Sequence, residues 1–254
     1  MPTVSAINLA PVKSLGLISL DRADIYSRGI EGDRRFIILD DSGKVVTQRQ
    51  IGQLTLVTAD CCTADNRLKV TFPDGSVIDG SPEPGEATAT VLWGRVVEGK
   101  LVKGPWSAAL SEFCGTELSL FESNSPGVCF DEYPVSIISQ ASIDYLTGLT
   151  GGSKAFEAER FRPTLLLDGC EPHEEDSWLG KGLRIGERLR LRLISRDPRC
   201  AITTLDPSTG ERDFDTLRLI LSYRPSVRAA YFGVYGIVES PGTVAVGDEV
   251  QLTI

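Results

Sequence analysis

The chain has 254 residues, enough to bury a full hydrophobic core in one large domain or two smaller ones, and two are expected. Its hydrophobic fraction of 41% and charged fraction of 24% are those of a globular protein and exclude a disordered or collagen-like chain. The net charge of −9 argues against nucleic acid as the main partner, because duplex binding depends on Lys and Arg side chains that neutralise phosphates.

Membrane and secretion signals are not expected in this sequence. No apolar run approaches the roughly 20 residues needed to span a bilayer. Met1–Leu15 lacks the basic-then-apolar layout of a secretory signal. These features predict a cytoplasmic protein without a membrane partner.

Six cysteines and one histidine give little material for a metal site made of protein ligands alone. The cysteines form no CxxC pair, so neither a tetrahedral zinc site nor a plant-type iron–sulfur spacing is expected. A disulfide between the adjacent Cys61 and Cys62 would be strained, which predicts two reduced thiols on opposite faces of a strand. The others are Cys114, Cys129, Cys170 and Cys200.

Strand patterns dominate the first half of the chain. Alternating or β-branched runs are separated by tight-turn sequences such as Asp41-Ser42-Gly43 and Pro73-Asp74-Gly75. This pattern predicts a β-barrel or sandwich. The expected strands are Val4–Leu9, Leu17–Tyr26, Arg35–Leu39, Leu54–Thr58, Leu68–Phe72 and Val96–Val102.

Helical patterns are short and few. Pro105–Phe113 begins with a proline, which suits a first helical turn, and Gly115 follows its end. Ser139–Leu149 begins with a capping serine and has apolar residues at helical spacing. Asp213–Ser222 alternates less regularly and is also expected to be helical.

Strands resume after about residue 120, and a domain boundary is expected near that point. The polar segment Asn124–Gly127 contains Pro126 and predicts a junction there. The sequence therefore predicts a mainly β protein with a few short helices, divided into an N-terminal β-barrel or sandwich domain (1–123) and a C-terminal β-barrel domain (124–254). The expected later strands are Thr164–Leu167, Arg188–Ile194, Tyr231–Val238 and Glu249–Thr253.

Cys200 lies in the sequence Asp197-Pro198-Arg199-Cys200. Pro198 is expected to end a strand, which would present the thiol on a loop beside the Arg199 cation. A neighbouring Arg favours the thiolate, the form that ligates a metal or attacks an electrophile. A buried, inert cysteine is the alternative, and spacing alone does not decide between the two.

Two sets of segments carry a family resemblance. The first set is Arg160-Phe161-Arg162-Pro163, Asp197–Gly210 and Gly242–Val250, and the second set is Ala10–Ser14, Gly32–Phe36 and Thr47–Gln50. The first set resembles the MOSC domain, the molybdenum-cofactor sulfurase C-terminal fold, and the second resembles the β-barrel domain that precedes it in one branch of the family. The matches occur in family order over nearly the whole chain. In type, the sequence resembles the bacterial reductases of N-hydroxylated bases and the mitochondrial amidoxime reducing component.

The resemblance implies a molybdenum cofactor, in which molybdopterin carries the metal. Cys200 falls where the family's cysteine ligates molybdenum, so it is the implied metal ligand and catalytic residue. A buried phosphate needs charge-assisted donors, which Arg and Lys provide. The implied cofactor-binding residues are Lys13, Ser14, Arg34, Arg162, Thr164 and Tyr235.

Each of these residues also has a simpler interpretation when taken singly. Lys13 could be a solvated turn residue, Arg34 and Arg162 could be surface ion-pair partners, and Tyr235 could be an ordinary strand aromatic. Only their joint occurrence with Cys200, in family order, favours the functional interpretation.

The implied activity is reduction of the N–O bond of N-hydroxylated compounds by a molybdenum-dependent oxidoreductase. Because the sequence has no cysteine set for an iron–sulfur cluster, the implied partner is a separate flavin or [2Fe-2S] electron-donor protein. In one alternative, Cys200 carries a persulfide in a sulfur carrier or cofactor-handling module. Pyridoxal phosphate binding is also associated with the family, but no pyridoxal-phosphate lysine motif or aminotransferase-like domain is expected ahead of the barrel. In another alternative, the chain only shelters the cofactor.

The sequence departs from the family pattern in two places, and one acidic loop needs separate comment. Thr164 replaces an Asn and so loses the two donors of the amide. Glu132-Tyr133 replaces a Thr-Ser pair, which would place a carboxylate near the metal centre. In the acidic loop, His173 is expected to be solvated, and Asp176 is a weak candidate for lining the pocket.

Overall fold

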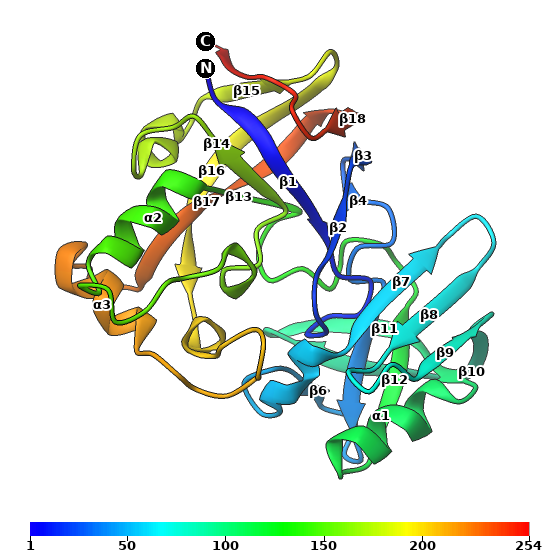
Figure 1. The fold of residues 1–254 in the computed structure, drawn as a ribbon. Helices are drawn as coiled ribbons and strands as arrows, with labels where there is room; N and C mark the ends of the chain where they lie inside the picture. The colour runs from blue at the N-terminus through cyan, green and yellow to red at the C-terminus, as the bar shows by residue number, and fades with distance from the viewer. Residues whose placement is uncertain (254) are drawn as a thin grey trace.

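Strands dominate the fold in the computed structural model, which describes residues 1–253 (Figure 1). The largest sheet has eight strands in the order β19-β15-β16-β17-β13-β14-β1-β2, and only its β13–β14 pair is parallel. The mainly β fold predicted from the sequence is confirmed. The strands of this sheet are β1 (Thr3–Leu9), β2 (Ile18–Leu20), β13 (Val135–Ser139), β14 (Leu165–Asp168), β15 (Gly182–Ile185), β16 (Leu189–Arg199), β17 (Ala230–Ser240) and β19 (Val250–Thr253).

Three smaller sheets complete the fold. The five-stranded sheet contains β5 (Phe36–Asp40), β6 (Val45–Val46), β10 (Glu83–Leu92), β11 (Arg95–Lys103) and β12 (Leu118–Ser123). One three-stranded sheet contains β7 (Thr58–Cys62), β8 (Arg67–Thr71) and β9 (Val77–Gly80). The other contains β3 (Arg22–Tyr26), β4 (Gly29–Ile30) and β18 (Gly242–Ala245).

Residues 3–9 and 22–30 pack into the core of the second half of the chain. Strand β1 pairs with β14, and β3 pairs with β18. Ile7 and Ile25 are fully buried in the same cluster as Leu165 and Val234. The two termini consequently lie close together, at the top of Figure 1. The boundary between residues 123 and 124 stays a prediction.

Strand β5 shows how the sequence builds the other half of the molecule. Its apolar run has no polar alternation, because both faces of the strand are covered. Phe36 and Ile38 face one buried cluster, and Ile37 and Leu39 face another. This double burial anchors the segment that precedes it, which carries Arg34.

The three expected helices are present, with ends shifted by up to three residues. Ser139 caps α2 by accepting a hydrogen bond from the Ser142 amide at 3.2 Å, and Asp215 caps α3 in the same way. Gly115 ends α1 in the left-handed conformation that glycine adopts without steric cost. The helices are α1 (Trp106–Cys114), α2 (Gln140–Gly148) and α3 (Thr216–Tyr223), and the short 3₁₀ helices are η1 (Gly52–Leu56), η2 (Ala158–Arg160), η3 (Glu174–Trp178) and η4 (Ala201–Thr204).

Three strand predictions are wrong in their extent or type. The segment predicted as the strand Leu54–Thr58 forms η1 instead, because its buried residues Leu54 and Val57 are three apart, the period of a 3₁₀ helix. The segment Leu17–Tyr26 divides at Asp21, whose carbonyl accepts from the Val246 amide, so β2 and β3 join different sheets.

Strand β16 does not end at Pro198. Pro198 lies opposite Tyr231, just after a register shift in the β16–β17 ladder, and the strand continues to Arg199. A proline is tolerated at such a bulge because no ladder hydrogen bond is required from its nitrogen. The other strands had no prediction: β4, β6, β7, β9, β10, β12, β13, β15 and β18.

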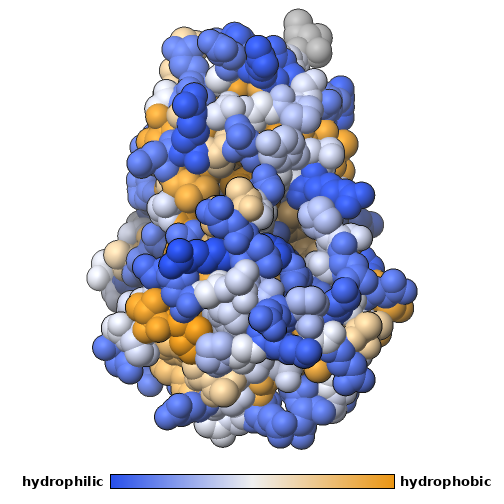
Figure 2. Space-filling model, turned by 90° about the vertical axis from the view of Figure 1, so that its right-hand side faces the viewer, coloured by the Kyte–Doolittle hydropathy of each residue, from blue (hydrophilic) through white to orange (hydrophobic). Residues whose placement is uncertain are grey.

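The surface is mainly hydrophilic on the side shown in Figure 2, with hydrophobic residues in small separate groups. Within residues 1–253, no helix combines the length and the apolar character needed to cross a bilayer.

The contact between Gly52 and Gly210 gives a test of how two loops that are far apart in the sequence pack together. A Cβ at Gly52 would lie 1.9 Å from the Gly210 carbonyl oxygen, so Gly52→Ala must displace backbone. We expect a loss of about 1–3 kcal/mol in the free energy of unfolding, measured by urea denaturation. Gly148→Ala is the control, because nothing lies within 4 Å of its added Cβ. Equal stability of Gly52→Ala and the wild type would show that the two loops are not in contact.

Candidate functional site

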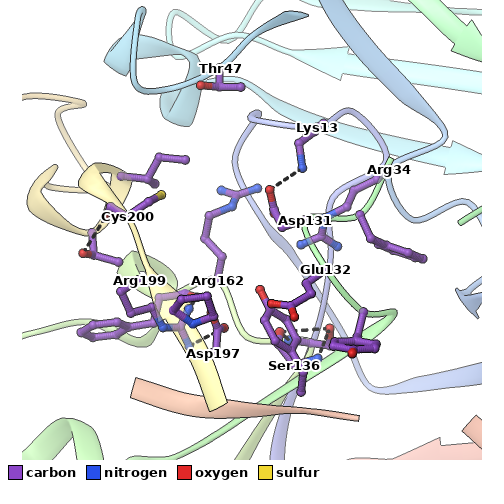
Figure 3. A pocket seen from close by; sticks show the side chains of 18 of the residues that line it. Lys13, Arg34, Thr47, Asp131, Glu132, Ser136, Arg162, Asp197, Arg199 and Cys200 are labelled. Atoms are coloured by element: carbon purple, nitrogen blue, oxygen red, sulfur yellow. Dashed lines mark hydrogen bonds and ion pairs between the residues drawn. The ribbon is translucent and has the colours of Figure 1, made fainter. Parts of the chain in front are cut away.

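A single pocket gathers residues from both halves of the chain (Figure 3). It encloses about 290 Å³. All seven residues singled out from the sequence line it, although their separations along the chain reach more than 200 residues. They are Lys13, Ser14, Arg34, Arg162, Thr164, Cys200 and Tyr235. The structure thus brings the candidate residues together, while their individual roles stay predictions.

Cys200 presents an exposed thiol to this pocket. The residue follows the last residue of β16 and is the N-cap of η4, where its carbonyl accepts from the Thr203 amide and hydroxyl. Figure 3 shows its sulfur directed toward the pocket interior. The alternative of a buried, inert cysteine is therefore wrong.

The Arg199 guanidinium makes its contacts with other segments of the chain. Its Nε and Nη1 groups donate to the carbonyls of Phe232 and Phe161, each at 2.7 Å. Its Nη2 lies 2.8 Å from the Asp197 carboxylate. The guanidinium is thus held by its own strand and by two neighbouring segments.

The turn that carries Lys13 and Ser14 is fixed by three other segments. The Lys13 amide donates to the Phe36 carbonyl at 2.8 Å. The Gln48 side-chain amide donates to the Ser14 carbonyl at 2.9 Å. Arg162 Nη2 donates to the Leu15 carbonyl at 2.8 Å. Because Arg162 comes from the second half of the chain, this last bond joins the two halves at the pocket.

Arg34 is positioned through its neighbour Asp33. The Asp33 carboxylate is fully buried, accepts from the Ala10 amide at 3.0 Å and forms an ion pair with Arg34. The Arg34 amide in turn donates to the Ala10 carbonyl at 2.9 Å. These bonds tie the Arg34 loop to the turn that carries Lys13.

Backbone strain is concentrated at the pocket. Among residues 1–253, six non-glycine residues have a positive φ, a region that costs L-residues on the order of 1 kcal/mol or more. Four of the six line the pocket: Ser14, Arg34, Trp93 and Arg162. Strain of this kind persists only where the surrounding structure enforces it.

Positive charge exceeds negative charge in the pocket. Burial, reinforced by the Arg34 charge, lowers the pKa of Arg162 to about 10. Burial also lowers the pKa of Lys13, against the opposing influence of Asp131. Although burial acts to raise it, the pKa of Asp131 falls to about 2 under the Lys13 and Arg34 charges. The ion pair with Asp33 raises the pKa of Arg34, so Lys13 and Arg162 are the cations whose charged form the site disfavours and a bound anion would stabilise.

Arg162 and Arg49 have no carboxylate within 4 Å in the described part of the chain. Arg49 instead lies over the Trp93 ring, 4.2 Å from its centroid. The two guanidinium groups therefore have hydrogen-bonding capacity left for a phosphate, which Arg binds through a planar fork of N–H groups. A cofactor with a phosphate fits this donor set.

Thr164 and Tyr235 line the pocket from β14 and β17. The Thr164 hydroxyl accepts from the Ser136 amide at 3.1 Å, so its acceptor capacity is partly used in joining β13 to the segment before β14. The Tyr235 ring packs against Tyr133 at 5.8 Å between centroids. Burial, together with the Asp197 charge, raises the pKa of the Tyr235 hydroxyl.

Some lining residues were not identified from the sequence. Asp131 forms an ion pair with Lys13 at 2.9 Å and accepts from the Trp93 indole at 3.1 Å. The Thr47–Gln50 segment was matched to the family, but it gave no reason to place Arg49 on Trp93. Asp197 stands three residues before Cys200, but its sequence context does not predict that it lines the pocket. No local pattern in the sequence could have indicated these contacts.

The expectations for the acidic loop are wrong. His173 is half-buried among Tyr145, Tyr223 and Phe232, with ring centroids 5.6 Å away in each case. Burial and the nearby Arg224 lower its pKa to about 4. Asp176 forms ion pairs with Arg224 and Arg196 and does not line the pocket. His173 is half-buried because it packs in an aromatic cluster, although its neighbours in the sequence are acidic.

Comparison with known families agrees with this arrangement. The profile of the MOSC domain matches residues 123–251, and that of the MOSC N-terminal beta barrel domain matches residues 1–114. The chain belongs to the MOSC domain family. Among its relatives is mitochondrial amidoxime reducing component 2 of Rattus norvegicus, 30% identical over 98% of this chain and 82% of that protein.

Two further MOSC relatives differ in their extent. Mitochondrial amidoxime-reducing component 1 of Mus musculus is 27% identical over 98% of this chain and 82% of its own length. The molybdenum cofactor sulfurase of Caenorhabditis briggsae is 26% identical over 92% of this chain but only 33% of its own length. Among solved structures, the YUAD protein of Bacillus subtilis has a TM-score of 0.48 and 16% identity, covering 99% of this chain and 96% of that one.

The charge balance of this MOSC pocket can be tested at Asp131. Lys13→Gln removes the ion pair, so the pKa of Asp131 should rise from about 2 toward the ordinary value for aspartate. The stability from this ion pair is fully present above the ordinary pKa of aspartate and is lost as the pH falls through the folded-state pKa of about 2. The midpoint of the Asp131 titration is measured by ¹³C NMR of the carboxyl groups. Arg67→Gln, which removes the exposed partner of Asp79, should leave the Asp131 midpoint unchanged. An unchanged midpoint in Lys13→Gln would contradict the charge assignment.

Proposed function

We propose that this MOSC protein is a molybdenum-cofactor-dependent oxidoreductase that reduces N-hydroxylated compounds. The supporting observation is the exposed thiol of Cys200 in a pocket whose cations outnumber its anions. The names of the amidoxime-reducing relatives support the substrate class. Neither the thiol nor the cations alone would distinguish this function from others.

In this proposal the chain provides two kinds of contact to the cofactor. Cys200, as a thiolate, is the protein ligand of molybdenum, since soft thiolates suit such metals. Lys13, Ser14, Arg34 and Arg162 hold the phosphate and the pterin, and Thr164 and Tyr235 complete the wall of the site. When bound, the cofactor supplies the two-electron reduction that breaks the N–O bond.

The remaining tasks belong to the protein. The clamped turn at Lys13 and the strained backbone at Arg34 and Arg162 fix the cations in advance, so little ordering is needed on binding. Glu132 and Tyr133 lie in the pocket wall and would contact the substrate. Electrons would come from a separate flavin or [2Fe-2S] protein that docks transiently.

A sulfur-carrier function is the second candidate, favoured by the match to a molybdenum cofactor sulfurase. In that case Cys200 would bear a persulfide and transfer its outer sulfur to an acceptor. Intact-mass analysis of the purified chain would show one additional sulfur that is lost on thiol reduction, without bound molybdenum. The reductase proposal expects the reverse result.

The first test of the reductase proposal is removal of the thiol. Cys200→Ala should lose bound molybdenum and the reduction of benzamidoxime, because no other cysteine lines the pocket among the described residues. Molybdenum is measured by elemental mass spectrometry on purified protein. Cys62→Ala, which removes an exposed thiol outside the pocket, should keep both properties. Retention of the metal in Cys200→Ala would rule out Cys200 as the ligand.

The second test addresses the phosphate. Arg162→Gln should weaken cofactor retention roughly tenfold to a hundredfold, since a hydrogen bond to a charged group contributes about 1.5–3 kcal/mol. Retention is followed as pterin fluorescence after gel filtration. Arg218→Gln, on the exposed face of α3, is the control. Equal retention in Arg162→Gln and the control would show that Arg162 does not contact the cofactor.

A further inference from the structure

Asp197 is a buried carboxyl in the pocket wall that the proposed function does not yet use. Its side chain is only 3% exposed, and it lies on β16 three residues before Cys200. Figure 3 shows it beside Arg199. An ion pair with this arginine would be the simplest explanation for a buried aspartate.

The ion pair is present, but it does not satisfy the hydrogen-bonding capacity of the two groups. Two of the Arg199 N–H groups are used by the Phe232 and Phe161 carbonyls. Arg199 Nη2 and Asp197 Oδ2 approach to 2.8 Å without a hydrogen-bonding orientation, and neither atom has a hydrogen-bond partner within residues 1–253. Buried polar atoms in folded proteins nearly always have a partner. Because Oδ2 is enclosed, the other carboxyl oxygen of Asp197, Oδ1, is the one that can meet a molecule in the pocket that this residue lines.

The charged and titratable groups around Asp197 act in opposite directions. Burial is the largest influence and raises the pKa of Asp197 to about 7. Arg199 on β16 and Tyr235 on β17 act to lower this pKa, whereas Asp131 and Glu132, from the segment before β13, act to raise it. Near neutral pH the group is therefore divided between carboxylic acid and carboxylate, which is the condition for efficient general acid catalysis.

Two other groups in the pocket are less suited to deliver a proton. Asp131 has a pKa of about 2 and remains a carboxylate at neutral pH. The raised pKa of Tyr235 means that its hydroxyl holds its proton tightly. Of these three groups, Asp197 alone can both donate a proton and recover it near neutrality.

We propose that Asp197 is the proton donor to the departing oxygen during N–O bond reduction, an inference that rests on the proposed function. Reduction of R–NH–OH to R–NH₂ breaks the N–O bond, consumes two electrons and two protons, and releases water. The bound molybdenum cofactor would supply the two electrons. One proton goes from Asp197 to the departing oxygen and the other comes from solvent to the nitrogen. Solvent then reprotonates Asp197.

The test compares pH profiles of benzamidoxime reduction by the cofactor-loaded full chain. The wild-type rate should fall as the pH rises through the pKa of Asp197, because only the protonated form donates. Asp197→Asn should lose this dependence and roughly 10²–10⁴ of the rate, the usual contribution of a general acid. Asp197→Glu keeps a carboxyl group and should retain the pH-dependent limb at a reduced rate.

Asp176→Asn is the matched control. It removes a partly buried carboxylate that is also paired with an arginine, but one that lies outside the pocket, so the pH dependence should persist. An unchanged pH profile in Asp197→Asn, with molybdenum bound and the enzyme active, would overturn the proposal and leave the proposed function intact.

Infrared difference titration gives a readout that does not depend on activity. A protonated-carboxyl band that titrates near neutral pH in the wild-type chain should be absent from Asp197→Asn and present in Asp176→Asn. Absence of any such Asp197-dependent band would overturn the proposal whether or not molybdenum is bound. A band that is present in a chain without molybdenum would support the Asp197 assignment and place the failure in the proposed function.

Discussion

The burial of three cations in one pocket, with repulsion among them, is the constraint that shapes the site. Burial and the neighbouring cations lower the pKa values of Lys13 and Arg162, whereas the buried Asp33 compensates Arg34 and Asp131 compensates the others only in part. Such an arrangement is unfavourable without a bound anion, because each cation has lost part of its hydration. The surrounding backbone must therefore hold the cations in place, and a phosphate would relieve the repulsion.

The architecture provides that restraint through contacts between distant segments. The first strand of the chain belongs to the same sheet as its last and packs in the core of the second half. The turn that carries Lys13 follows this strand, and its neighbours Val12 and Leu15 pack in the core of the first half. Arg162 bonds to this turn from the other half of the chain. The positive φ angles at Ser14, Arg34 and Arg162 are consistent with a site whose geometry is enforced by its surroundings.

Sequence patterns predicted the features that depend on contacts between neighbouring residues, such as helix ends. The serine before α2 and the glycine after α1 act at the helix ends, as expected. The segment at Leu54 was predicted wrongly as a strand, because burial at every third residue makes it a 3₁₀ helix. The end of β16 was predicted wrongly, because a bulge in the ladder accommodates Pro198 within the strand. The seven candidate site residues could be chosen only by family resemblance. Contacts such as Lys13 with Asp131, 118 residues apart, have no local signature.

Cys200 is the one cysteine among residues 1–253 that lines this cationic pocket, so the proposed chemistry depends on its thiol. The most direct measurement is anomalous diffraction at the molybdenum edge from crystals of the chain purified with its cofactor. A single peak within bonding distance of the Cys200 sulfur, with phosphate density against Lys13, Arg34 and Arg162, is the expected result. A metal peak away from that sulfur, or an empty pocket in protein that contains molybdenum, would contradict the central claim.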